Sequence, residues 1–231
     1  MDNHSIKNTN SKKVHIIGTI LIVLFVIFSI IMIIMTNPSK KNRSAKETDL
    51  PEEYVIQTEN YFDYQEAYDC SGYSTAYVLR SLGIDVKGHE LYEKIPQKFA
   101  DGTVPIESIM NYLQNEGYEV NVCSGSIENL KKELYKGVPV VSFVRMIPNT
   151  EYYHYIAIVG YGKDVIYAVD SERGQVNTEN EYYNRVIKNE DFLNMCDTGF
   201  YEKNTYITIG LKKRSETYDK SLFCTSCSAR S

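Results

Sequence analysis

The pattern of apolar and polar positions divides the chain into one long uncharged segment and a series of shorter amphipathic segments. The long segment, residues 16–35, contains no charged side chain. A helix of about 20 residues rises about 30 Å, which is the thickness of the hydrocarbon core of a bilayer. The pattern therefore predicts one transmembrane helix, at residues 16–36. No small-residue cleavage pattern follows it, which favours an uncleaved signal anchor over a cleaved signal peptide.

Helical patterns dominate the first half of the chain beyond this anchor. Apolar residues recur there at helical spacing, and Gly83, Gly117 and Gly137 follow the last turns of three segments. One further helical segment lies closer to the C-terminus. The predicted helices are residues 70–82, 88–95, 105–116, 126–136 and 189–196.

Strand patterns dominate the second half. Segments rich in Val, Ile and Tyr and bounded by turn residues predict strands at residues 138–146, 153–160, 165–170 and 205–211. Helices followed by a meander of strands predict an α+β domain of two layers, in which a helical N-terminal half packs on an antiparallel sheet.

The polar segments set the expected limits of this domain. We expect an N-terminal tail at residues 1–15, a polar stalk at residues 37–60 and the globular domain at residues 61–212. Residues 213–231 lack apolar periodicity, which predicts a flexible C-terminal tail.

Charge and composition narrow the classes of partner. The 231-residue chain has a net charge of −5 and 43% hydrophobic residues, which is typical of a globular domain and unlike a nucleic-acid binder. Basic residues flank the predicted span on both sides and give no orientation. A short tail before a first span commonly stays in the cytoplasm. We therefore expect a single-pass membrane protein that contacts the lipid bilayer through residues 16–35, with the domain on the extracytoplasmic side.

Cys70 is a candidate nucleophile because it stands at the start of a predicted helix. The unpaired amide groups and the positive end of the helix dipole favour an anion at that place, and a thiolate is the reactive form of cysteine. The same amides could bind the oxyanion of a tetrahedral intermediate. The alternative, a small buried apolar cysteine, is about equally consistent with this helix start alone. The chain has five cysteines, so complete pairing would leave one thiol free.

A cysteine nucleophile needs a base, and elimination favours His154. Two of the four histidines, His4 and His15, lie before or at the edge of the predicted span. His89 follows Gly88 at a helix start, where an exposed or capping role is the simpler interpretation. His154 stands at the start of a predicted strand, and its simpler interpretation is a solvated strand-end residue.

Asp170 is the candidate partner of His154 in a hairpin. A turn centred on Gly162 would place Asp170 directly opposite His154, and opposed residues on one face lie about 4.5–5.5 Å apart. A carboxylate there can orient the imidazole. A slip of one residue would move Asp170 to the other face. Taken alone, Asp170 would be interpreted as a turn residue.

Gln65 lies shortly before Cys70 in the sequence. Its side-chain amide could donate a hydrogen bond to the oxyanion from the side opposite the helix. A glutamine at this position is uninformative alone and gains meaning only from its neighbours.

The order Gln65, Cys70, His154 and Asp170 resembles the papain-like cysteine peptidases. The resemblance is greatest to the bacteriocin-processing peptidases that remove double-glycine leaders, cysteine-peptidase family thirty-nine, and to their stand-alone relatives. It extends over nearly all of residues 61–211. The matching stretches are residues 65–83, 137–141, 154–160, 166–170 and 191–192.

The resemblance implies a papain-like fold with Cys70 as nucleophile, His154 as base, Asp170 as orienting residue and Gln65 in the oxyanion hole. Two departures concern the substrate. The family often has Gly-Pro after the cysteine, where this chain has Ser71-Gly72, and Asp-Pro in the last triad strand, where it has Asp170-Ser171.

We therefore expect a membrane-anchored thiol peptidase that hydrolyses peptide or isopeptide bonds of a peptide or protein substrate, without a metal or organic cofactor. Two alternatives keep the same fold. One is a catalytically silent, membrane-tethered peptide-binding module, and the other is an acyltransferase that forms the same thioester. The transporter that usually accompanies the leader peptidases is not part of this sequence, so cleavage after a double glycine is one possibility among several.

Overall fold

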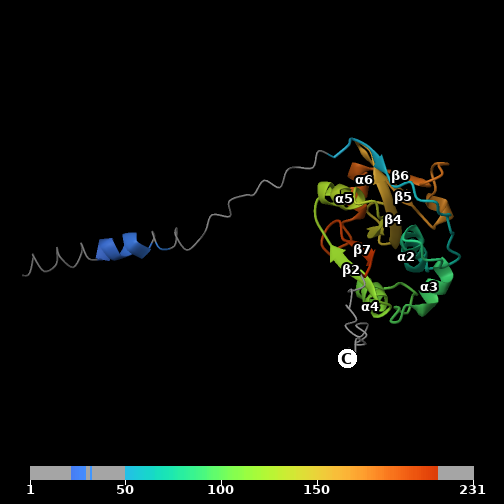
Figure 1. Ribbon diagram of the computed structural model, residues 1–231, viewed down its shortest axis with the longest axis horizontal. Coiled ribbons are helices and arrows are strands. Elements are labelled where there is room, and N and C mark those ends of the chain that lie inside the picture. Colours follow the sequence, from blue (N-terminus) through green and yellow to red (C-terminus); the bar gives the residue numbers. More distant parts are fainter. Residues whose placement is uncertain (1–21, 30–31, 33–49, 213–231) are drawn as a thin grey trace, which may run out of the picture. The chain divides into compact units, whose positions relative to one another are not determined.

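The computed structural model describes residues 22–29, 32 and 50–212 of the chain (Figure 1). Two compact units separate at residue 50. In the first unit, residues 22–29 are helical. None of the helices in the described ranges is long and apolar enough to cross a membrane. Most of the predicted anchor at 16–36, and the two predicted tails, lie outside the described residues.

The second unit contains five α-helices among its described residues, and each coincides with a predicted helix to within a few residues. Glycines with positive φ follow three of them, at Gly83, Gly117 and Gly137, as the helix-ending pattern predicts. The helices are α2 (Cys70–Ser81), α3 (Gly88–Lys94), α4 (Ile106–Asn115), α5 (Ile127–Leu134) and α6 (Asn189–Met195).

The helices pack against one antiparallel sheet, which confirms the predicted α+β class. Its strands follow the spatial order β2-β7-β3-β4-β5-β6, with β1 paired to β4 outside this path. All of the strand pairs are antiparallel. The strands are β1 (Tyr54–Val55), β2 (Tyr118–Cys123), β3 (Val140–Arg145), β4 (Tyr153–Tyr161), β5 (Val165–Val169), β6 (Arg185–Lys188) and β7 (Tyr206–Leu211).

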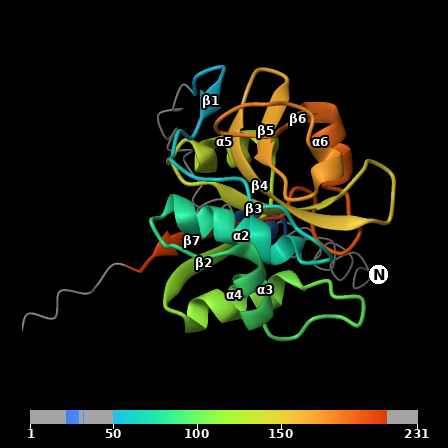
Figure 2. The same ribbon diagram turned by 90° about the vertical axis from the view of Figure 1, so that its right-hand side faces the viewer.

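Helices cover both faces of the sheet, so the domain has three layers instead of the two predicted. In Figure 2, α2, α3 and α4 lie in the lower half of the view and α5 and α6 in the upper half. Strand β4 contributes to both apolar cores: Ala157 packs with α2 and α4, and Ile158 packs with α5 and α6. The alternation of side chains along a strand explains why neighbouring residues belong to different cores.

The N-terminal limit of the domain lies earlier in the chain than predicted, and the predicted stalk at residues 37–60 is too long. Tyr54 and Val55 pair with β4, and Ile56 is buried in the core around α5 and α6. The Asn60 amide donates to the carbonyl of Tyr77 in α2. The sequence predicts a stalk here because β1 is too short to show an alternating pattern and polar residues surround it.

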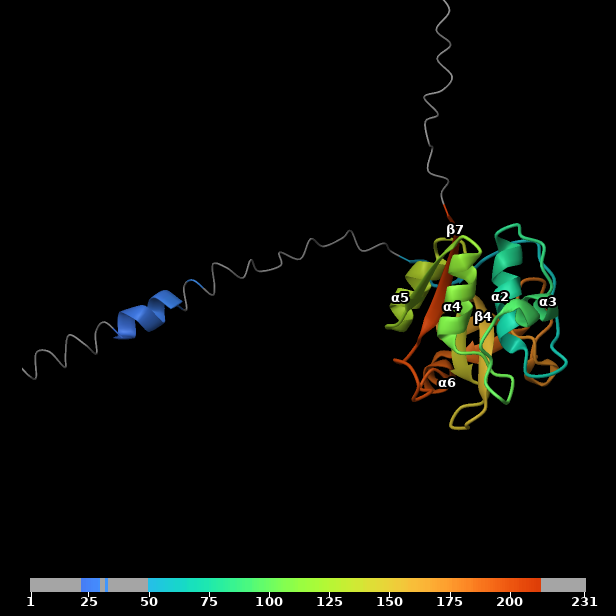
Figure 3. The same ribbon diagram turned by 90° about the horizontal axis from the view of Figure 1, so that it is seen from below.

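Helices α2 and α3 approach each other closely beside the start of α2 (Figure 3). A Cβ atom on Gly72 would lie 2.4 Å from the carbonyl oxygen of Gly88, and one on Gly88 would lie 2.4 Å from the Tyr73 ring. Both glycines are therefore needed for the contact, which holds α3 against the turn of α2 that carries Cys70.

The hairpin of β4 and β5 has a different register from the predicted one. Ala157 stands opposite Val169 and Ile158 opposite Ala168, so this register continues with Asp170 opposite Ile156. The prediction of His154 directly opposite Asp170 is therefore wrong by two residues. An irregularity between Ile158 and Gly160 shifts the pairing closer to the turn, and such bulges are not visible in a sequence pattern.

At the outer edge of β6, one side chain pairs with both backbone groups of Val186. The Asn177 amide nitrogen donates to the carbonyl of Val186, and the Val186 N–H donates to the Asn177 amide oxygen, each over 2.8 Å. The Asn177 side chain thus satisfies the same two backbone groups that a neighbouring strand would.

Candidate active site

Cys70 is the first residue of α2, as the sequence predicts. Asp69 precedes the helix as its cap residue, without a side-chain cap hydrogen bond. Cys70 is 7% exposed, and the Ser74 hydroxyl donates to the Cys70 carbonyl over 2.8 Å. Because the first amide groups of a helix have no partner within the helix, the sulfur lies at a place that favours negative charge.

His154 and Asp170 form a buried pair in spite of the shifted register. The ring Nε2 of His154 lies 2.7 Å from Oδ1 of Asp170, and the side chains are 1% and 0% exposed. A shift of two residues returns a side chain to the same face of a strand, because the side-chain period is two. The contact therefore survives as a diagonal neighbour pair instead of a directly opposed one.

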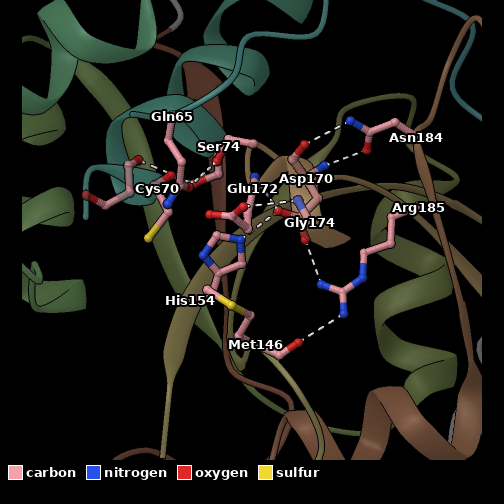
Figure 4. Close-up of polar contacts among 12 residues, drawn as sticks. Gln65, Cys70, Ser74, Met146, His154, Asp170, Glu172, Gly174, Asn184 and Arg185 are labelled. Atoms are coloured by element: carbon pink, nitrogen blue, oxygen red, sulfur yellow. Dashed lines mark hydrogen bonds and ion pairs between the residues drawn. The ribbon is translucent and has the colours of Figure 1, made fainter. Parts of the chain in front are cut away.

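The second ring nitrogen of His154 is directed away from Asp170. Nδ1 is buried and makes no standard hydrogen bond to any described residue. Figure 4 shows the Cys70 sulfur on this side of the ring and Asp170 on the other. Hydrogen bonds of reacting groups are often long before a substrate binds, so the loose contact between sulfur and ring is compatible with proton transfer.

The pKa of His154 reflects both neighbours. Burial lowers it, but the negative charges of Asp170 and Cys70, together with the hydrogen bond to Asp170, outweigh burial and raise the pKa from 6.5 to about 10. Both neighbours therefore favour the protonated form of the ring. Conversely, burial raises the pKa of Asp170, but the charge and hydrogen bond of His154 and the charge of Arg185 hold it below its ordinary value.

Asp170 has a second cationic partner, Arg185, which the sequence analysis did not identify. Its Nη1 lies 2.6 Å from Oδ2 of Asp170, and its Nη2 donates to the carbonyl of Met146 over 3.0 Å. The Glu172 N–H also donates to Oδ1 of Asp170 over 2.8 Å. Arg185 begins the four-residue strand β6, where a sequence gives no sign that an arginine side chain is directed inward.

Asn184, the residue before Arg185, holds the backbone of Asp170. Its amide oxygen accepts from the Asp170 N–H, and its amide nitrogen donates to the Asp170 carbonyl, each over 2.8 Å. Asn184 is 2% exposed. Both ends of the orienting residue are thus fixed, the carboxylate by Arg185 and the main chain by Asn184 (Figure 4).

Gln65 is held beside this group. Its backbone N–H donates to the carbonyl of Ser171 over 3.0 Å, and its amide oxygen accepts from the Ser171 hydroxyl over 2.7 Å. The amide nitrogen donates to the carbonyl of Ala67 over 2.8 Å. Figure 4 shows the side chain directed toward Cys70. One N–H of this amide remains for another acceptor.

His89 is exposed, as predicted, but it also lies near the nucleophile. Its Nδ1 is 3.4 Å from Oδ2 of Asp69, the residue before Cys70, and its side chain is 65% exposed. Asp69 itself is buried and accepts a hydrogen bond from the Ala67 N–H. The structure therefore brings together all four residues proposed from the sequence and adds Asp69, His89, Ser171, Asn184 and Arg185 around them.

Two solved structures resemble the whole domain. A protein from Bacillus anthracis described as a C39-like peptidase superposes with a TM-score of 0.53 and 16% identity, over 71% of this chain and 99% of its own. The peptidase domain of Streptococcus ComA, a bifunctional ABC transporter of a quorum-sensing pathway, gives 0.52 and 14%, over 67% of this chain and 99% of its own. At these identities the likeness establishes the fold. No curated protein matches the chain in sequence.

The family comparison places the chain in the class of cysteine-type peptidases. The family model that matches it, over residues 50–202, is described as the peptidase C39-like family. The chain therefore belongs to the C39-like peptidase family, which confirms the resemblance found in the sequence.

Proposed function

We propose that this protein hydrolyses peptide bonds through Cys70, His154 and Asp170, with Gln65 donating to the oxyanion. The observation that supports the proposal most directly is the arrangement around His154. Nε2 is held by Asp170 at 2.7 Å, and the buried Nδ1 faces the sulfur at the start of α2. This is the geometry in which an imidazole can exchange a proton with a neighbouring nucleophile.

The proposed reaction proceeds in two steps. The Cys70 sulfur forms a bond to the substrate carbonyl carbon, and the carbonyl oxygen becomes an anion that the Cys70 N–H and the Gln65 amide bind. The C–N bond then breaks as His154 gives its proton to the leaving amine, which leaves a thioester. Water next attacks the thioester, His154 takes up the proton of that water, and the acid is released with the thiolate restored.

Selective alkylation tests the nucleophile. At neutral pH, iodoacetamide should modify Cys70 at least about tenfold faster than Cys123, as peptide mapping by mass spectrometry would measure. Exposure alone predicts the reverse order, since Cys70 is 7% exposed and Cys123 is half-buried. Burial also raises the pKa of the Cys123 thiol, which makes it an inert reference.

A His154→Gln variant is the matched control for alkylation. It should slow the modification of Cys70 and leave that of Cys123 unchanged, because only Cys70 faces the ring. Equal and slow labelling of both thiols in the unaltered chain would favour the silent peptide-binding module. Transfer of the acyl group to an added amine, in preference to water, would favour the acyltransferase.

The pH dependence of hydrolysis should reflect the raised pKa of His154. The leaving amine needs a proton from the imidazolium, so kcat/KM should fall as the pH rises through about 10. This alkaline limit belongs to the coupled pair of Cys70 and His154. Asp170→Asn removes the largest cause that raises the pKa and should move the limit to lower pH. A limit near pH 7 in the unaltered chain, or one that Asp170→Asn does not move, would contradict this account.

Attachment to a bilayer is part of the proposal, and it is supported by the uncharged run at residues 16–35. The full chain should sediment with membranes, with the domain accessible to an added protease from the extracytoplasmic side. A chain that begins at residue 37 should remain in the supernatant, and sedimentation of both chains would argue against the anchor.

A further inference from the structure

We infer that Ser171 is a positioning residue for catalysis, because its hydroxyl fixes the orientation of the Gln65 amide and so directs the amide N–H groups to the site. The inference rests on the proposed function and assigns a role to a residue outside the four taken from the sequence.

The hydrogen bonds around Gln65 allow only one orientation of its amide. The carbonyl oxygen of Ala67 can only accept, so the amide nitrogen must face it, at 2.8 Å. The amide oxygen then faces the Ser171 hydroxyl at 2.7 Å, and a hydroxyl can donate. Without that donor, the amide oxygen would lose its only hydrogen bond from a described residue, and the single contact with Ala67 would hold the amide less firmly.

Ser171 is itself held in place. It is 4% exposed, it follows Asp170 directly, and its carbonyl accepts from the Gln65 N–H over 3.0 Å. The strand end that orients His154 thus also orients the amide, through two hydrogen bonds to one glutamine. One residue pair therefore connects the two halves of the proposed machinery: proton transfer at His154 and oxyanion binding at Gln65.

The expected signature is a loss of kcat without a loss of thiol reactivity. An oxyanion donor acts on the tetrahedral intermediate and hardly on bound substrate, and removal of one donor typically costs about 10²–10³ in kcat. Ser171→Ala leaves the donor present but misdirected, so kcat should fall about tenfold with KM unchanged. The alkylation of a thiol by iodoacetamide forms no oxyanion. The alkylation rate of Cys70 and its pH dependence should therefore remain those of the unaltered chain.

The experiment measures both rates on the full chain in detergent, with a fluorogenic peptide amide selected on the unaltered protein. Ser108→Ala is the matched control. Ser108 is also a buried serine, 2% exposed, and its hydroxyl donates to the carbonyl of Gln97, a residue outside the proposed machinery. Its kcat and alkylation rate should both stay within about twofold of those of the unaltered chain.

A second background separates positioning from a general structural effect. In a Gln65→Ala chain, Ser171→Ala should cause no further loss of kcat, because the residue through which it acts is absent. Equal losses in both backgrounds would overturn the inference, and so would a parallel fall of alkylation and kcat. Normal kcat in Ser171→Ala would overturn this inference alone. A chain that neither hydrolyses peptides nor alkylates selectively at Cys70 would overturn the proposed function as well.

Discussion

Replacement of Cys70 by serine should reduce peptide hydrolysis by at least about 10³-fold and leave the folded domain intact. Removal of a nucleophile commonly costs a factor of about 10⁶ in kcat. In this site the loss has a specific cause. A serine hydroxyl is far less acidic than a thiol, so it is a much weaker nucleophile at neutral pH. Hydrolysis of a fluorogenic peptide by the full chain measures the effect.

Two controls accompany this experiment: the stability of the Cys70→Ser chain and the activity of a chain with a different cysteine replaced. Serine has the same shape as cysteine, with an oxygen atom in place of the sulfur. The urea midpoint of Cys70→Ser should therefore remain close to that of the unaltered chain. Cys123→Ser changes a thiol on β2, outside the proposed site, and should retain full activity. A Cys70→Ser chain that kept more than a tenth of the activity would show that another residue is the nucleophile.

Replacement of Arg185 by methionine should lower the free energy of unfolding by about 3–5 kcal/mol, because it leaves the buried Asp170 carboxylate without one of its two cations. The arginine is 6% exposed and Asp170 is 0% exposed, so water cannot replace the lost charge. Activity should fall as well, since the carboxylate that holds His154 would be free to move. Urea unfolding and peptide hydrolysis measure the two effects.

An exposed ion pair of the same length is the control for Arg185. Lys203 lies 2.6 Å from Asp197, as Arg185 does from Asp170, but its side chains are 71% and 52% exposed. Lys203→Met should cost less than about 1 kcal/mol, because water solvates the remaining carboxylate. Equal losses for the two variants would mean that burial does not decide the energy of the Asp170 pair.

The sequence predicts those features that depend on local pattern. Glycines with positive φ follow α2, α4 and α5, and the start of α2 at Cys70 is where the pattern places it. Strand β2 is not predicted because it is an edge strand and buries only Val120, so its alternation is weak. Strand β6 was missed because four residues are too few to show a period.

The pair of His154 and Asp170 shows why a site can be predicted from an inaccurate register. The predicted hairpin was wrong by two residues, yet an even shift preserves the face on which a side chain lies. Arg185 and Ser171 could not be found in this way. Their roles depend on contacts across strands and loops that are distant in sequence, and neither residue type indicates chemistry alone.

Asn177 at the outer edge of β6 has a consequence for the association of one molecule with another. An edge strand with unpaired backbone N–H and C=O groups can pair with an edge strand of another molecule, and this pairing can begin a fibril. Asn177 occupies both groups of Val186 with a side chain that no foreign strand can extend. Two molecules that meet at this edge therefore find no free backbone group at Val186.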